Sequence, residues 1–161
     1  AISAYGTNGV PEKLLAGLEA RFIETKKPRD LTLMFAGGIG DGKDRGLNRL
    51  GHEGLLKRVI GGHYGLIPKI ERLALENKIE AYNFPEGVIT HLYRNIAAGN
   101  QGALSLIGLE TFVDPRLEGA KINEAAKEDL VELLTLNDEE TLYFKGCPIN
   151  IAFIRGTTAD P

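Results

Sequence analysis

The sequence lacks the features that several common classes of protein require. It has one cysteine, Cys147, among 161 residues, so an internal disulfide is excluded and a reducing cytosol is the simplest compartment. Its formal net charge of -3 provides no basic field, which makes nucleic acid a poor default partner. No apolar run reaches the roughly 18 residues needed to cross a bilayer, and the first residues lack the charged, apolar and small-residue zones of a signal peptide. These absences predict a soluble, cytoplasmic protein.

Motifs for nucleotide, metal or thiol chemistry begin in the sequence but are not completed. The glycine-rich run 37–46 follows most of the phosphate-loop pattern, but Asp44 stands where a hydroxyl should hold magnesium. His52 opens a zinc-protease motif whose second histidine is replaced by Leu56. We therefore predict no metal site, and we interpret the run as a mobile or ligand-covering loop. Cys147 lies among apolar residues, which favours a buried thiol over a nucleophile.

The periodicity of the apolar residues predicts an α/β domain. Short apolar or alternating runs indicate strands, and several of them are followed by segments with helical spacing. This alternation predicts an open, mainly parallel sheet with helices on both faces, to which later strands add antiparallel pieces. The region 100–123 is irregular and is interpreted as loop with short elements. The predicted strands are 1–4, 31–36, 59–60, 78–84, 131–136, 141–144 and 149–154, and the predicted helices are 11–27, a short one within 50–59, 68–77 and 88–97.

Two glycine-containing turns connect predicted strands to predicted helices. Gly6 and Gly9 bracket a turn whose backbone N–H groups face the positive end of the helix that begins at Pro11, a place for a carboxylate or a thioester oxygen. The second turn is 84–87, which places Glu86 at the carboxyl edge of the sheet. The structural alternatives are a tight strand-to-helix connection for the first turn and a first-turn acid that favours the helix dipole for Glu86.

Specific strings in the sequence resemble those of family I coenzyme A transferases, in the propionate or acetate CoA-transferase branch. The resemblance runs along essentially the whole chain. It is carried by the strings 52–64 and 76–83, with support from 41–48, 111–116 and 154–160. It implies a polypeptide of two related α/β halves, in which 1–161 is a single domain and most of the N-terminal half, with the C-terminal half absent. The start of the chain inside a predicted strand, without an initiator methionine, agrees with that expectation.

The resemblance also implies a reaction. In the family, a glutamate of the second half attacks acyl-CoA, and the reaction proceeds through a glutamyl-CoA thioester to a short carboxylic acid such as acetate. No glutamate of this chain matches that nucleophile, so the chain supplies no catalytic residue and is expected to be inactive alone. Coenzyme A is a substrate rather than a cofactor. The implied partners are acyl-CoA, short carboxylic acids and the C-terminal half of the same polypeptide, in a homo-oligomer.

The resemblance finally implies which residues of this chain line the substrate pocket. The substrate-binding residues that it implies are Gly6, Asn8, Gly9, Gly62, His63, Glu86 and Gly87. Two of the matches depart from the family pattern. The first turn usually has two adjacent glycines and a phenylalanine, and Glu86 stands where glutamine is usual. Because an ionised Glu86 would repel a substrate carboxylate, we expect it to be protonated, paired with a cation or turned away.

Two other functions remain open from the sequence. The first is a non-catalytic module that binds an acyl group or CoA without chemistry. The second is a sugar-phosphate isomerase of related architecture, although such an enzyme wants a basic phosphate site that the sequence does not offer.

Overall fold

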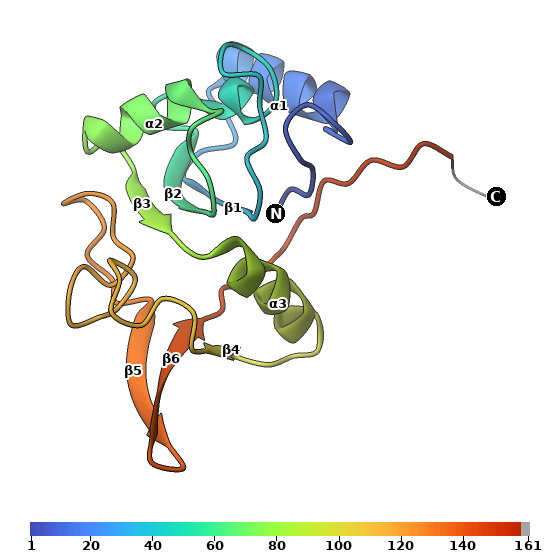
Figure 1. The fold of residues 1–161 in the computed structure, drawn as a ribbon. Coiled ribbons are helices and arrows are strands. Elements are labelled where there is room, and N and C mark those ends of the chain that lie inside the picture. The colour runs from blue at the N-terminus through green and yellow to red at the C-terminus, as the bar shows by residue number, and fades with distance from the viewer. Residues whose placement is uncertain (159–161) are drawn as a thin grey trace.

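The computed structural model describes residues 1–158, and Figure 1 shows its fold. Ala159 and Asp160, which end the string 154–160, lie outside this range. None of the helices in the described part of the chain is long and apolar enough to cross a membrane. The elements in chain order are α1 (Glu12–Thr25), β1 (Leu31–Phe35), the 3-10 helix η1 (Leu47–Leu50), β2 (Leu56–Gly61), α2 (Pro68–Leu75), β3 (Glu80–Asn83), α3 (Glu86–Ala97), β4 (Gly102–Ser105), β5 (Val131–Leu136) and β6 (Glu139–Lys145).

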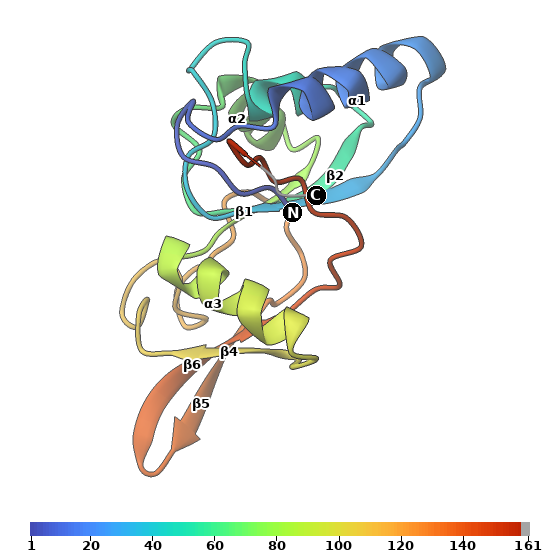
Figure 2. The ribbon, with the colours of Figure 1, turned by 90° about the vertical axis from the view of Figure 1, so that its right-hand side faces the viewer.

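The first three strands form a parallel sheet in the order β1-β2-β3. Successive side chains of a strand point to opposite faces, so the aligned rows of the sheet alternate between two hydrophobic cores. Leu33, Val59 and Ala81 form a row that packs with α1 and α2, while the next row packs with α3. Figures 1 and 2 show α1 and α2 on one side of this sheet and α3 on the other. The prediction of an α/β domain with helices on both faces of a parallel sheet is confirmed.

The antiparallel strands form a second sheet in the order β4-β6-β5. Its inner face packs against α3, and the rings of Phe84 and Phe144 meet edge to face with centroids 5.2 Å apart. The β5–β6 turn places Asn137 and Asp138 at positive φ, which suits a two-residue hairpin. The predicted strands 131–136 and 141–144 therefore belong to this separate sheet. β4 falls in a region that was predicted as loop with short elements. It is a strand because it pairs with β6, some forty positions later, and no local sequence pattern indicates that pairing.

Three predicted elements differ from the structure. The predicted short helix within 50–59 is wrong: η1 ends at Leu50, and β2 begins at Leu56 as the central strand. The leucines there have a spacing that suits either a helix or a strand buried on both faces, and the parallel neighbours select the strand. The predicted strands 1–4 and 149–154 make only isolated bridges. The Ile2 N–H donates to Met34 O at 3.1 Å, and the Phe153 N–H donates to Ala1 O at 2.9 Å.

The irregular segment between β4 and β5 is organised by a buried carboxylate. Asp114 is 1 % exposed, and it accepts hydrogen bonds from the backbone N–H groups of Glu110 and Arg116 and from the Arg116 guanidinium. These donors, the guanidinium first, hold the pKa of Asp114 well below its usual range. The segment then returns to the parallel sheet, where the Asn83 N–H donates to Ala120 O at 2.9 Å. Asp114 thus fixes a long loop that closes the free edge of β3.

We expect Asp114→Asn to lower the melting temperature by several degrees at neutral pH, because the amide cannot accept all of these hydrogen bonds. The depressed folded-state pKa means that the ionised Asp114 stabilises the fold above its unfolded pKa of about 3.9. That contribution is lost as the pH falls through the folded pKa. In melting curves from pH 7 to pH 3, the difference between the two proteins should be constant above about pH 4 and should begin to narrow below it. Asp129→Asn, at a carboxylate 77 % exposed, is the control, and an equal loss there would contradict this account.

Candidate functional site at the carboxyl edge of the parallel sheet

The carboxyl ends of β1, β2 and β3 bring three turns to one edge of the sheet. This edge is where open α/β sheets bind their ligands. The Gly62 N–H donates to Phe35 O at 3.1 Å, and the Phe84 N–H donates to Gly61 O at 3.1 Å, so each strand end is bonded to the next. The turns after β2 and β3 contain predicted site residues.

Gly62 is packed between the other two strand ends. A Cβ atom placed on it would collide with the Ala36 carbonyl oxygen and would come within 2.6 Å of Glu86 Cγ. Real Cβ atoms essentially never approach other atoms so closely. Only glycine therefore fits, and the structure brings Gly62 and Glu86, 24 positions apart in the sequence, into direct proximity.

The Gly6–Gly9 turn joins the same edge through the loop after β1. The Gly6 N–H donates to Gly38 O at 2.6 Å, and the Gly40 N–H donates to Gly6 O at 2.9 Å. Gly6 and Gly9 have φ of 56° and 67°, and the space where their side chains would stand is open. The Asn8 N–H closes the turn onto Tyr5 O at 2.8 Å. Because the Gly6 N–H is already used, the N–H groups of Thr7 and Gly9 are the ones in this turn that donate to no other residue within 1–158.

His63 lies between the turns after β1 and β2. A Cβ atom on Gly38 would be 2.7 Å from His63 Nδ1, so the exposed imidazole lies directly against the Gly38 backbone. Tyr64, the next residue, points inward and donates to Tyr82 O at 2.8 Å, and burial raises its pKa well above the ordinary value. His63 is therefore available to a ligand, whereas Tyr64 is structural.

Glu86 is the first residue of α3 and is exposed at the edge. This position agrees with the structural alternative for Glu86, in which an acid in the first turn interacts favourably with the helix dipole. Within residues 1–158 it makes no ion pair, so a cationic partner for it is not found in this part of the chain. Gly87 follows on the same exposed turn, where its carbonyl oxygen accepts a hydrogen bond from Thr90 Oγ1 at 2.7 Å.

The loop 37–46 was predicted as a mobile or ligand-covering loop, and the structure shows how it is held. Asp41 Oδ1 accepts hydrogen bonds from the backbone N–H groups of Lys43, Asp44 and Arg45, which keep the pKa of Asp41 below its usual value. Glu12 of α1 accepts another from the Gly46 N–H at 3.0 Å. The carboxylates of Asp41 and Glu12 thus shape the loop. No group of three or more metal-binding side chains is found within the described residues.

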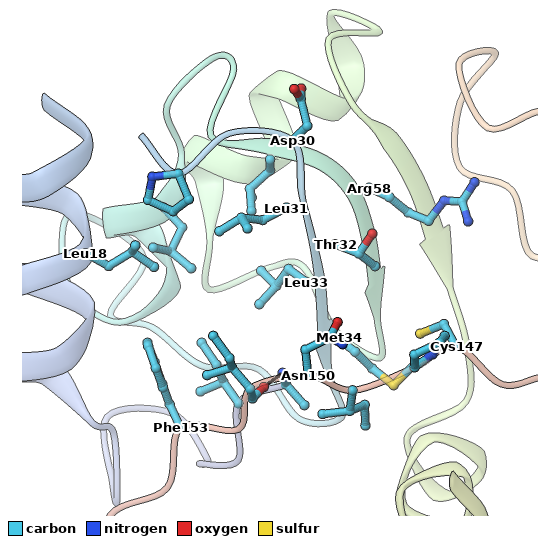
Figure 3. Close-up of a pocket in the computed structure, with 18 residues that line it drawn as sticks. Leu18, Asp30, Leu31, Thr32, Leu33, Met34, Arg58, Cys147, Asn150 and Phe153 are labelled. Atoms are coloured by element: carbon cyan, nitrogen blue, oxygen red, sulfur yellow. Dashed lines mark hydrogen bonds between the residues drawn. The ribbon is translucent and has the colours of Figure 1, made fainter. Parts of the chain in front are cut away.

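Two pockets differ in their relation to these residues. A pocket of about 430 Å³ includes Gly62, His63 and Asn83 at the carboxyl edge, with α2 and the 112–122 segment as its other walls. A pocket of about 640 Å³ lies along the outer side of β1 and is shown in Figure 3. The second pocket contains none of the predicted site residues, so its size does not make it the better candidate. Cys147 lines it and is half-buried rather than buried as predicted, and this partial burial raises the pKa of the thiol, which does not favour a nucleophile.

Sequence reasoning missed two contributors to the edge. Gly38 was assigned only to a loop, although it bonds the Gly6 turn and supports His63. Asn83 was assigned only to the end of a strand, although its side chain lines the 430 Å³ pocket. A polar residue as the last member of a buried parallel strand was the available signal for Asn83, because such positions lie at the ligand-binding edge.

The fold and the edge together define an α/β domain with several glycine-containing turns gathered at the carboxyl edge of a parallel sheet. The chain belongs to the coenzyme A transferase family, whose model, described as Coenzyme A transferase, matches residues 1–161. The family resemblance that the strings predicted is confirmed.

Named relatives extend this assignment. The chain is 46% identical over 147 residues to the acetate CoA-transferase YdiF of Escherichia coli strain K12, which covers 91% of this chain and 28% of that protein. It is 41% identical over 159 residues to the caffeate CoA-transferase of Acetobacterium woodii, covering 99% of this chain and 30% of that protein. The chain thus spans less than a third of the length of these relatives.

Two solved structures share this fold. The crystal structure of the acyl-CoA transferase YdiF apoenzyme from Escherichia coli O157:H7 matches 96% of this chain and 30% of its own, with a TM-score of 0.89 and 42% identity. The thioester complex of YdiF with CoA matches 95% of this chain and 32% of its own, with a TM-score of 0.89 and 43% identity.

Proposed function

We propose that these residues form one wall of the acyl-handling cleft of an enzyme that transfers coenzyme A between a short-chain acyl-CoA and acetate or another short carboxylic acid. The observation that carries the proposal is the convergence of the Gly6–Gly9, Gly38, Gly62 and Glu86 turns at one sheet edge, in a chain 46% identical to an acetate CoA-transferase. Assembly as a homo-oligomer in the cytoplasm is part of the same proposal.

The proposed mechanism places the nucleophile outside this chain. A glutamate carboxylate attacks the acyl-CoA carbonyl, forming an acyl-glutamyl anhydride and expelling the CoA thiolate. The thiolate then attacks the glutamyl carbonyl, which releases the first acid as its carboxylate and leaves a glutamyl-CoA thioester. Acetate reverses both steps and leaves as acetyl-CoA. Each carbonyl attack creates an oxyanion, and the N–H groups of Thr7 and Gly9 are among the backbone donors that this wall offers to one.

The test is a CoA-transfer assay on the full-length protein, with a short acyl-CoA as donor and isotopically labelled acetate as acceptor. Labelled acetyl-CoA should form, and double-reciprocal plots at several acetate concentrations should be parallel, as covalent ping-pong catalysis requires. Residues 1–161 alone should show no transfer. Binding of acyl-CoA by the full-length protein without any transfer would overturn the proposal and favour a non-catalytic acyl-binding module.

Glu86→Gln tests the charge at the edge. We expect the substitution to preserve kcat/KM for acetate or to raise it by up to about fivefold, because an exposed carboxylate repels an approaching one by only about 1 kcal/mol. Initial rates against acetate concentration give the comparison. Glu24→Gln, an exposed acid on α1, is the control and should change nothing. A large loss of turnover in Glu86→Gln alone would show that the carboxylate itself takes part in the reaction.

A further inference from the structure

Asn83 ends β3 at the level where β2 also ends. Asn83 and Gly61 are paired residues in the register of these two parallel strands, and both are the last of their strands. The side-chain amide of Asn83 donates two hydrogen bonds, from Nδ2 to Gly61 O at 2.8 Å and to Gly62 O at 3.0 Å. One side chain therefore binds two successive carbonyl oxygens of the turn that contains the predicted site residues.

These two hydrogen bonds set the direction of the chain after β2. Gly62 lies so close to the Ala36 carbonyl oxygen and Glu86 Cγ that no side-chain atom fits between them. His63 is the next residue in the chain. A rotation of either peptide plane would move Gly62 relative to Glu86 and would carry the His63 ring away from Gly38. Backbone hydrogen bonds to Phe35 O and from the Phe84 N–H also hold the Gly61–Gly62 peptide plane. The Gly62–His63 plane has no backbone partner within the described residues, so the Asn83 amide is the donor that fixes it.

We propose that Asn83 is a positioning residue of the transfer reaction, which holds the Gly61–His63 turn in the geometry that receives the acyl thioester. It acts through the turn. This inference rests on the proposed function, and it adds a residue that is not among the substrate-binding residues implied by the family resemblance.

Only an amide fits this role at position 83. Two N–H donors on one nitrogen match two carbonyl acceptors, whereas an aspartate of the same shape would present oxygen to both carbonyls. An alanine would remove the amide from both carbonyl oxygens and would leave that of Gly62 without a hydrogen-bond donor within the described residues. Asparagine to aspartate is therefore the sharpest substitution, and asparagine to alanine is the milder one.

The kinetic test uses Asn83→Asp and Asn83→Ala in the full-length transferase. We expect kcat to fall about tenfold or more, with KM for acyl-CoA changed less than about threefold, because misplacement by a fraction of an ångström lowers the rate more than the binding. Asn83→Asp should recover part of its kcat as the pH is lowered, since a protonated carboxyl donates one hydrogen bond, and Asn83→Ala should not. Asn95→Ala removes a comparable amide-to-carbonyl bond to Gly102 O, far from the edge, and should keep its kcat.

A second readout does not depend on activity. Amide hydrogen exchange at residues 61–64 should become faster in Asn83→Ala and stay unchanged in Asn95→Ala. Unchanged exchange, or faster exchange with an unchanged kcat, would overturn the positioning role. If the wild-type protein transfers no CoA, the proposed function fails, and the exchange result still decides whether Asn83 holds the turn. If Asn83→Asp does not fold, Asn83→Ala carries both measurements.

Discussion

Gly62→Ala is expected to lower the CoA-transfer rate of the full-length protein by about 100-fold or more. The added methyl group collides with the Ala36 carbonyl oxygen and comes within 2.6 Å of Glu86 Cγ, so the three strand ends have to separate. A displacement of about 1 Å in a reacting site is enough for a loss of this size. The measurement is kcat/KM for acyl-CoA and for acetate, compared with the wild type.

Gly17→Ala is the matched control for that experiment. Gly17 lies in the middle of α1 with open space where its side chain would stand, so alanine should leave the rate unchanged and stabilise the helix by about 0.5–1 kcal/mol. A Gly62→Ala protein with wild-type rates would show that the carboxyl edge does not contact the reacting groups, and the assignment of the site would then be wrong.

Phe144→Ala should cause the largest loss of stability, about 3–5 kcal/mol in the free energy of unfolding. Phe144 is fully buried, and it joins the antiparallel sheet to the parallel one through its edge-to-face contact with Phe84. Its truncation leaves a cavity in the core that holds α3, the helix that begins with Glu86. Denaturant-induced unfolding measures the change.

Leu104→Ala supplies the comparison within the same sheet. Leu104 is 54 % exposed on β4, so its truncation should cost less than about 1 kcal/mol. Similar losses for the two variants would mean that the antiparallel sheet does not share a core with α3, contrary to the packing described here.

The parallel half of the fold was predictable because its signals are local. Pro11 and Pro28 bound α1, Pro68 begins α2, and the apolar run of β1 is buried on both faces. The same locality explains the errors. β4 is a strand only because β6 pairs with it, and the residues of β2 have a spacing that suits two structures until β1 and β3 flank them. Pairing between distant segments decides these elements, and a single window of sequence does not contain it.

The candidate site was predictable in part for a similar reason. Glycines that follow predicted strands indicated the turns at Gly6, Gly62 and Gly87, because a glycine after an apolar or alternating run is a local signal for a turn. The contacts between the turns were not predictable: the Gly6 N–H is taken by Gly38, and Gly62 meets Glu86. The support from Asn83 also depends on the register of β2 and β3, which only the folded sheet defines.

The most direct measurement of the central claim is hydrogen–deuterium exchange of the full-length protein with and without a short acyl-CoA under turnover conditions. Bound thioester should protect the backbone amides of 6–9, 37–40 and 61–64 together, since we propose that those turns form one wall of the cleft. Protection confined to other parts of the protein, with these three turns exchanging as in the free enzyme, would contradict it.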